Sequence, residues 1–365
     1  MSEHFAIDLM AGLREIFDAP ANNEQPRLEW WDDASPLAAI SVTVGAFGAQ
    51  EFSYSNAVRD LARWQATFDL DGTPVTKVRT SADLDRLSQC NRLGVLLNLQ
   101  NAAPLEGPVE RTDTLFNLGI RQVQLTYNYR NLVGDGCLER ANAGLSEFGR
   151  QLIGTLNNLG IAIDVSHCGH RTTLEAAEMS NRPVMASHTG AWRLYPHRRN
   201  KTDEELSAIA ETGGVIGIYT VPFLLGEAPV TLDTVIDHIA YVADKVGIDH
   251  VAIGADRPDY DPNEASREVW EAFWKSQTFS ATRDDAIRAG WPPFVEGARY
   301  LADWGGLLNQ MARRGFDAVS VRAVAGGNAW QFFKQVLPQG PGASDDPRQR
   351  CVERVPAAPS ASDRP

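Results

Sequence analysis

Two histidines are the residues of this chain best placed to do chemistry. His167 ends the apolar run IAIDVSH, and His188 ends the next such run, RPVMASH. If both runs are parallel strands, their carboxyl ends meet at one edge, where two neutral imidazoles can share a metal ion. Asp256 ends a third run, DHVAIGAD, and would add an anionic oxygen. A lone strand-end histidine is more often only hydrogen-bonded, but this combination favours a metal site.

Further polar side chains follow other apolar runs. Gln100 and Asn101 come after LGVLLNL, and Tyr127 comes after IRQVQLT. Arg199 lies in YPHRRNKTDEE, just before a helical segment. A guanidinium binds a carboxylate or a phosphate through two parallel hydrogen bonds, so Arg199 is a candidate anion clamp. The alternative for Arg199 is a solvated surface charge.

The elements that would position these residues alternate regularly along the chain. The apolar runs are nearly continuous in Val, Ile and Leu, as in parallel strands buried on both faces. They span residues 5–10, 37–44, 93–100, 120–127, 161–167, 182–188, 213–220 and 249–256. Helical patterns separate most of them, so we predict an α/β fold of the (β/α)₈ TIM-barrel type. A doubly wound sheet is the weaker alternative, because no GxGxxG motif follows the first run.

The boundaries of the predicted domain come from composition. Residues 1–337 carry the alternating pattern and form one predicted barrel domain. Residues 338–365 are rich in Pro, Ser, Asp, Arg and Ala, which predicts a disordered C-terminal tail. The chain has 34 Lys and Arg against 47 Asp and Glu, a net charge of −13, which argues against nucleic acid or an anionic membrane as partner.

Compartment is predicted from cysteine use and hydropathy. The four cysteines show no CxxC spacing and form no disulfide framework. No basic segment followed by an apolar run marks a signal peptide, and no run approaches the ~18 apolar residues of a membrane span. We therefore expect a soluble cytoplasmic protein with reduced thiols.

A family resemblance rests on several long motifs. The segment DVSHCGHRTTLEAAEMSNRPVMASHTGAWRLYPHRRNKTDEELSAIAETGGVIGIY resembles the core of the renal-type (membrane) dipeptidases, as do GLSEFGRQLIGTLNNLGI, IDHVAIGAD and AGGNAWQFF. That family consists of (β/α)₈ metallohydrolases with a two-zinc centre. The resemblance implies that His167 and His188 are paired metal ligands and that Arg199 binds the substrate carboxylate. It also implies that Asp256 is the late-strand aspartate of the catalytic centre.

The same resemblance exposes departures from the family pattern. Where the first strand of the family carries His-x-Asp, this chain has Met10 and Gly12. Gln100 stands in place of the bridging glutamate, and Tyr127 in place of a substrate-binding histidine. Hydrolysis at such a centre needs a hydroxide held by metal, so the loss of these ligands makes ordinary dipeptide hydrolysis doubtful.

The main functional hypothesis follows from these departures. LQNAAP and QLTYNYRNLVGDGC resemble a divergent branch that includes the non-haem diiron monooxygenases of platensimycin and platencin diterpenoid antibiotic biosynthesis. That resemblance implies two Fe(II) ions, O₂, an external electron donor and a hydrophobic carboxylate or CoA-linked substrate. The predicted metal ligands are His167, His188, Gln100 and Asp256. The predicted catalytic residues are Tyr127 and Asp256, and the predicted substrate-binding residues are Arg199, Asn101 and Tyr127. Extra metal ligands could come from Asp8, Glu51 or Tyr127.

Two alternatives stay open. One is a zinc-dependent dipeptidase or amidohydrolase with an altered metal site. The other is a barrel without catalytic activity that binds a ligand through a decayed site. Metal analysis separates the three hypotheses, because they predict iron, zinc or no metal.

Overall fold

The architecture is a closed ring of parallel strands. The computed structural model describes residues 4–13, 28, 30–32, 34–45, 52–89, 91–108, 110–258, 268 and 294–340. The ring strands are β1 (Ala6–Ala11), β2 (Leu37–Thr43), β4 (Leu93–Leu99), β5 (Ile120–Gln124), β6 (Ala162–Asp164), β7 (Val184–Thr189), β8 (Val215–Ile218) and β9 (Val251–Ile253). Their order is β2-β1-β9-β8-β7-β6-β5-β4, and pairing between β2 and β4 closes the ring. A short extra strand, β3 (Val75–Lys77), adds to β4.

All eight ring strands coincide with the eight apolar runs of the sequence. The predicted (β/α)₈ barrel is therefore confirmed, and the doubly wound alternative is excluded by the β2–β4 pairing. Among the strands of the described residues, the sequence pattern missed β3, whose three residues are too short for a periodic signal.

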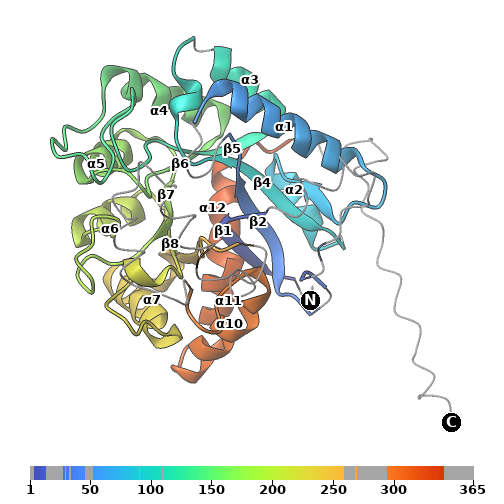
Figure 1. The fold of residues 1–365 in the computed structure, drawn as a ribbon, viewed down its shortest axis with the longest axis vertical. Helices are drawn as coiled ribbons and strands as arrows, with labels where there is room; N and C mark the ends of the chain where they lie inside the picture. The colour runs from blue at the N-terminus through green and yellow to red at the C-terminus, as the bar shows by residue number, and fades with distance from the viewer. Residues whose placement is uncertain are drawn as a thin grey trace.

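Helices surround the ring (Figure 1). They are α1 (Tyr54–Asp69), α2 (Ser81–Leu87), α3 (Glu110–Leu118), α4 (Glu147–Leu159), α5 (His170–Met179), α6 (Asp203–Glu211), α7 (Leu232–Val246), α10 (Trp304–Arg313), α11 (Ala318–Arg322) and α12 (Asn328–Val336). Local sequence sets their ends. Thr202 and Glu205 form a capping box at the start of α6, and Gly160 ends α4 in the left-handed conformation.

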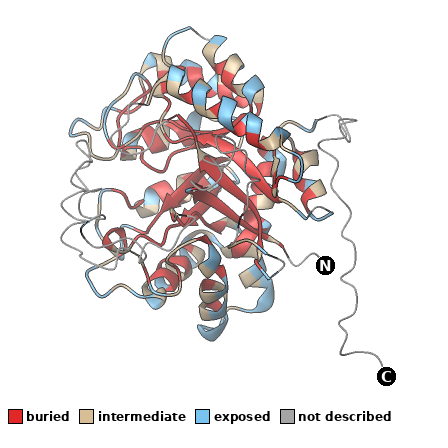
Figure 2. Cartoon of the chain, turned by 45° about the vertical axis from the view of Figure 1, so that its right-hand side comes forward, coloured by how far each residue is buried: buried red, intermediate tan, exposed pale blue. Residues whose placement is uncertain are grey.

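Two apolar layers hold the barrel together, and the strands are buried throughout (Figure 2). Outward-facing residues such as Ile163 and Ile216 belong to the large cluster beneath the surrounding helices. A second cluster fills the N-terminal end of the barrel, where Met185 meets Phe332 and Phe333 of α12. The helix α12 therefore closes the end of the barrel opposite to the strand ends that carry the polar residues.

A backbone bulge near the end of β7 depends on two glycines. The β7–β8 register shifts between Ala186 and Thr189. The carbonyl oxygen of Ser187 occupies the space that side chains at Gly217 and Gly254 would need. A Cβ atom would lie 1.9 Å from this oxygen at Gly217 and 1.7 Å from it at Gly254. Only glycine fits at either position, so Gly217 of β8 and Gly254, just after β9, shape the end of β7.

Within the described ranges, no helix is both long enough and apolar enough to cross a bilayer. Of the predicted C-terminal tail, residues 341–365 lie outside the described residues, and Pro338 accepts a hydrogen bond from the backbone of Ser81.

We predict that Gly254→Ala destabilises the fold, because the added methyl group overlaps the Ser187 carbonyl. The expected loss is about 1–3 kcal/mol, the usual cost of overpacking. Gly154→Ala is the matched control, since a Cβ atom there meets nothing within 4 Å. The control should stabilise helix α4 by ~0.5–1 kcal/mol. Urea unfolding of both variants measures the difference, and equal stability of the two would contradict the steric argument.

Candidate metal centre

The two histidines meet at the mouth of the barrel. His167 lies in the turn after β6, and His188 lies in the last part of β7. Their Nε2 atoms are 2.9 Å apart, and both side chains are buried. The structure thus brings together the two imidazoles that the sequence pattern placed on neighbouring strands.

Hydrogen-bond partners determine which nitrogen of each ring carries the proton. His167 Nδ1 lies 2.8 Å from Asn128 Oδ1, an acceptor. His188 Nδ1 lies 2.8 Å from the hydroxyl of Ser187, whose proton goes to Asp164. Both Nδ1 atoms are therefore assigned as donors, which leaves two bare Nε2 atoms facing each other. Burial, with a further contribution from Arg199, holds the pKa of both imidazoles well below the ordinary value, so they are neutral at pH 7.

Gln100 completes this arrangement. Its side-chain nitrogen lies 3.5 Å from His188 Nε2, and its Oε1 atom is buried without a hydrogen-bond partner. Two bare imidazole nitrogens lie beside the amide group of Gln100, and rotation of this amide by 180° exchanges its nitrogen for its unpartnered oxygen. The three groups then form a donor set that fits a divalent metal ion. In the described part of the chain, no three His, Cys, Asp or Glu side chains cluster as ligands. His167, His188 and Gln100 provide donors for one ion, and the second ion expected from the sequence stays a prediction.

Of the proposed extra ligands, Asp8 and Tyr127 lie within the described residues, and their role as ligands stays a prediction. Asp8 Oδ1 accepts hydrogen bonds from the backbone of Met10 and Ala255. Burial raises the pKa of Asp8 to about 6, an effect opposed by the charge of Arg257. Glu51 lies outside the described residues. At the first-strand positions, the Met10 sulfur accepts a hydrogen bond from Thr43, and Gly12 offers no side chain.

Arg199 is buried beside the imidazoles rather than exposed at the surface. Its guanidinium donates to the carbonyl oxygens of Ser166 at 2.6 Å and His188 at 3.4 Å. These bonds fix the cation against both histidine-bearing strands. A guanidinium has five N–H donors, so others are left to bind an anionic group of a ligand.

Asp256 follows β9 and interacts electrostatically with Arg199. Its backbone is in the left-handed region, with φ of 55°, and its amide donates to the carbonyl of Met10. Such a conformation is costly for a residue other than glycine, and it is found mainly at functional sites. Burial raises the pKa of Asp256 to about 6, while Arg199 opposes the rise. Within the described residues, Asp256 does not join the two histidines in a cluster of three ligands.

Tyr127 and Asn101 occupy different positions at the mouth. The Tyr127 ring stacks on His167 with centroids 4.2 Å apart, and Phe52 packs against it at 5.4 Å. Burial, together with the nearby charge of Asp256, raises the pKa of Tyr127 to about 12, so its phenol stays neutral. Asn101 uses its side-chain oxygen within the loops, where it accepts from Ala103 and Asn131. A substrate-binding role for Asn101 stays a prediction.

Sequence reasoning missed the residues that support the site. Ser187 and Asp164 support His188, but such short polar residues have no distinctive spacing. Asn128, which supports His167, stood at a strand end in the sequence but was assigned no role. Lys201 is buried and donates to the Cys168 carbonyl at 3.0 Å, which ties down the residue after His167. Its spacing of four residues from Glu205 was a visible signal for a helical ion pair.

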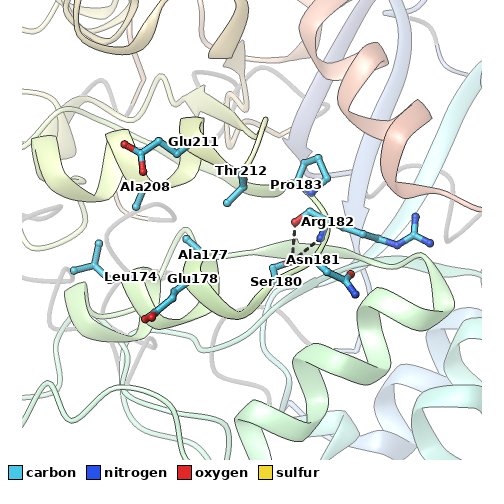
Figure 3. Close-up of a pocket in the computed structure, with 10 residues that line it drawn as sticks. All are labelled: Leu174, Ala177, Glu178, Ser180, Asn181, Arg182, Pro183, Ala208, Glu211 and Thr212. Atoms are coloured by element: carbon cyan, nitrogen blue, oxygen red, sulfur yellow. Dashed lines mark hydrogen bonds between the residues drawn. The ribbon is translucent and has the colours of Figure 1, made fainter.

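A surface groove between α5 and α6 lies away from this centre (Figure 3). Leu174 and Ala177 line it from α5, and Ala208 lines it from α6. Arg182 and Pro183, which precede β7, place it near the N-terminal end of that strand, whereas His188 lies near the opposite end. The groove therefore does not belong to the metal centre.

The fold and the donor set define a barrel of the metal-dependent hydrolase type. The model of the membrane dipeptidase family, peptidase family M19, matches residues 37–276, about two thirds of the chain. The chain belongs to this family.

Individual relatives agree with the family assignment. The dipeptidase tcpJ of Claviceps purpurea is 25% identical over 258 residues, 70% of this chain and 53% of the relative. The chain spans about half the length of the curated relatives it matches. Among solved structures, an amidohydrolase from Pseudomonas aeruginosa is 27% identical, with a TM-score of 0.77 over 92% of this chain and 97% of the other. A dipeptidase of family M19 has a TM-score of 0.72 over 93% and 100% at 18% identity, which shows the shared fold.

These findings correct the main functional hypothesis. The prediction of an iron monooxygenase is wrong, because the matched family and the named relatives are dipeptidases and amidohydrolases. The predictions of an oxidoreductase class, of O₂ and of an external electron donor are wrong for the same reason. The zinc hydrolase alternative fits the findings better. Histidine and amide donors suit iron and zinc alike, so residue types alone could not separate an oxygenase from a hydrolase.

We predict that Glu205→Gln destabilises the support of the His167 turn. Burial alone would raise the pKa of Glu205, but Lys201, His170 and the Thr202 amide lower it to about 2. The charged form is therefore favoured in the folded chain, and its stabilisation is present above pH 4.5 and lost towards pH 2. The expected loss at pH 7 is about 3 kcal/mol, measured by urea unfolding.

The neighbouring exposed residue gives the control for this prediction. Glu204 has a 69% exposed side chain, so Glu204→Gln should change the stability by less than ~1 kcal/mol. The difference between Glu205→Gln and the unsubstituted chain should shrink as the pH falls from 4.5 to 2. A difference independent of pH would show that the Glu205 charge does not stabilise the fold.

Proposed function

We propose that the protein is a metal-dependent hydrolase that cleaves the amide bond of a dipeptide or a similarly small substrate. The observation that carries this proposal is the convergence of two bare imidazole nitrogens 2.9 Å apart, beside the side-chain amide of Gln100. Membership of the dipeptidase family and the likeness to an amidohydrolase support the reaction class. Zinc is the proposed metal, since imidazole ligation suits it and a hydrolase needs no redox chemistry.

The proposed centre holds a single ion bound by His167, His188 and Gln100. When bound, the ion supplies a Lewis acid that polarises the scissile carbonyl and acidifies a water molecule. Asp256, with a pKa of about 6, is mostly ionised at neutral pH and serves as the proton acceptor. The pKa values of both imidazoles are depressed, which keeps them neutral and able to ligate.

Substrate orientation falls to the other residues of the mouth. Arg199 holds the substrate carboxylate through the N–H donors that its two carbonyl contacts leave over. Tyr127 covers one face of His167 with a neutral ring and keeps water away from that face. Burial of these groups strengthens each electrostatic interaction within the site.

We predict that the purified chain binds about one equivalent of zinc and that His188→Ala abolishes this binding, because one imidazole and one amide oxygen are too few ligands. Metal content by mass spectrometry after dialysis tests this. His250→Ala is the control, since His250 bonds to the Gly214 carbonyl and lies at the start of β9, near the other end of the barrel. Hydrolysis of a dipeptide panel should follow metal content, and zinc-loaded protein that cleaves no dipeptide or related amide would contradict the proposal.

We predict that Arg199→Ala raises the KM for a substrate with a free carboxylate by about 10- to 100-fold, since a charge-assisted pair contributes ~1.5–3 kcal/mol. Metal content should stay unchanged. Arg198→Ala, which alters the exposed neighbouring arginine, should leave KM unchanged. For a substrate whose carboxylate is amidated, the Arg199 variant and the unsubstituted enzyme should have the same KM. If Arg199→Ala and Arg198→Ala had equal KM values for the substrate with a free carboxylate, Arg199 would not belong to the binding site.

A further inference from the structure

We propose that Asp164 is a positioning residue for the metal centre and that it acts on His188 through the hydroxyl of Ser187. This inference rests on the proposed metal site and goes beyond it. It states that a buried carboxylate, which does not contact the metal-binding imidazole, determines which nitrogen of that ring is protonated.

Five hydrogen bonds converge on the Asp164 carboxylate. Oδ1 accepts from the Ser166 amide at 3.0 Å, the Ser166 hydroxyl at 2.6 Å and the Ser187 amide at 3.0 Å. Oδ2 accepts from the Ser187 hydroxyl at 2.5 Å and the Gln122 amide nitrogen at 3.1 Å. The carboxylate is thereby saturated with donors, and it takes the hydroxyl protons of both serines.

Because Ser187 donates its hydroxyl hydrogen to Asp164 in a hydrogen bond, its oxygen acts as an acceptor towards His188. The Ser187 oxygen lies 2.8 Å from His188 Nδ1, and with its own proton committed it can only accept from that nitrogen. The proton of the imidazole is therefore held on Nδ1, and the lone pair is left on Nε2. The opposite tautomer would direct an N–H group at His167 Nε2, 2.9 Å away, and would block metal binding.

The serine is held in place by backbone geometry as well. Its carbonyl fits into the space left by Gly217 and Gly254, and the Ser166 hydroxyl accepts from the His188 amide at 3.0 Å. The end of β7 is thus fixed on both sides of the Ser187–His188 peptide. This restricts how far the Ser187 hydroxyl can move from Asp164.

The carboxylate in turn belongs to a polar chain across the barrel interior. Gln122 accepts from the Ser41 hydroxyl at 2.8 Å, Ser41 accepts from Asn98 at 2.8 Å, and Asn98 accepts from Thr43 at 3.0 Å. Burying so many polar groups is costly unless each is paired, and apolar residues could fill the same space. Of these residues, Gln122 of β5 bonds directly to Asp164, whereas Ser41 of β2 and Asn98 of β4 reach it only through Gln122.

The test measures the tautomer and the metal affinity separately. Nitrogen NMR of ¹⁵N-histidine-labelled, metal-free protein reports which ring nitrogen of His188 is protonated, with His188→Gln used for assignment. Zinc affinity is measured by competition with a chromophoric chelator. The variants are Ser187→Ala, which removes the acceptor, and Asp164→Asn, which weakens the hold on the serine proton. Ser41→Ala is the matched control, because Ser41 is equally buried in the same chain but touches neither His188 nor Asp164.

The unsubstituted protein and Ser41→Ala should carry the His188 proton on Nδ1. Ser187→Ala should move a measurable fraction of it to Nε2 and weaken zinc binding by about 10- to 100-fold, the usual effect of losing such a support. Asp164→Asn should shift both quantities in the same direction. Ser187→Ala is the mildest change and decides the question if Asp164→Asn fails to fold.

An unchanged tautomer and unchanged zinc affinity in Ser187→Ala would overturn the inference. Equal losses in Ser187→Ala and Ser41→Ala would also overturn it, since any cavity in the polar chain would then have the same effect. If the unsubstituted protein bound no zinc, the proposed function would fail, while the tautomer measurement would still decide the role of Asp164 and Ser187.

Discussion

The arrangement of this site depends on two neutral imidazole lone pairs directed at each other across 2.9 Å. Such a contact is repulsive without a cation between the nitrogens, and it persists only if the surrounding protein holds both rings. Asn128 holds one ring and Ser187 holds the other. The stability of the barrel therefore supplies the energy that keeps the centre ready for a metal ion.

A cation placed beside a metal site creates a second constraint. Arg199 is buried next to both imidazoles and lowers their pKa values, which favours ligation but adds positive charge near a divalent ion. Asp256 lies in the same field and is mostly ionised at neutral pH, so it offsets part of this charge. Lys201, which pairs with Glu205 behind the His167 turn, contributes after burial, Arg199 and His188 to the lowered pKa of His167.

The fold was readable from the sequence because parallel strands buried on both faces leave a strong signal. Each of the eight ring strands lies in one of the predominantly apolar runs, and the capping box at Thr202 was visible as well. The principal site residues were also accessible, since His167 and His188 end neighbouring runs. The supporting residues were not, because the roles of Ser187 and Asp164 depend on a bulge and on contacts between strands far apart in the sequence.

The reaction class was not readable from the residues at the mouth alone. Replacement of the first-strand ligands by Met10 and Gly12 has the same appearance in an oxygenase and in a hydrolase with a reduced centre. The interior polar chain of Ser41, Asn98 and Gln122 could not be foreseen either, since each residue on its own reads as an interruption of an apolar strand.

The position of α12 has a consequence for biosynthesis. This helix inserts Phe332 and Phe333 beneath the barrel, and Asn328 donates to the carbonyls of Ile248 and Val251 at the start of β9. The first strand pairs with the last, β9, so the ring itself closes late in translation. A nascent chain that has emerged only as far as β9 lacks α12, so Met185 and its neighbours are still exposed at the N-terminal end of the barrel. Helix α12 therefore acts as a seal, and its packing beneath the barrel, rather than the emergence of the metal ligands, sets the moment at which the interior becomes dry.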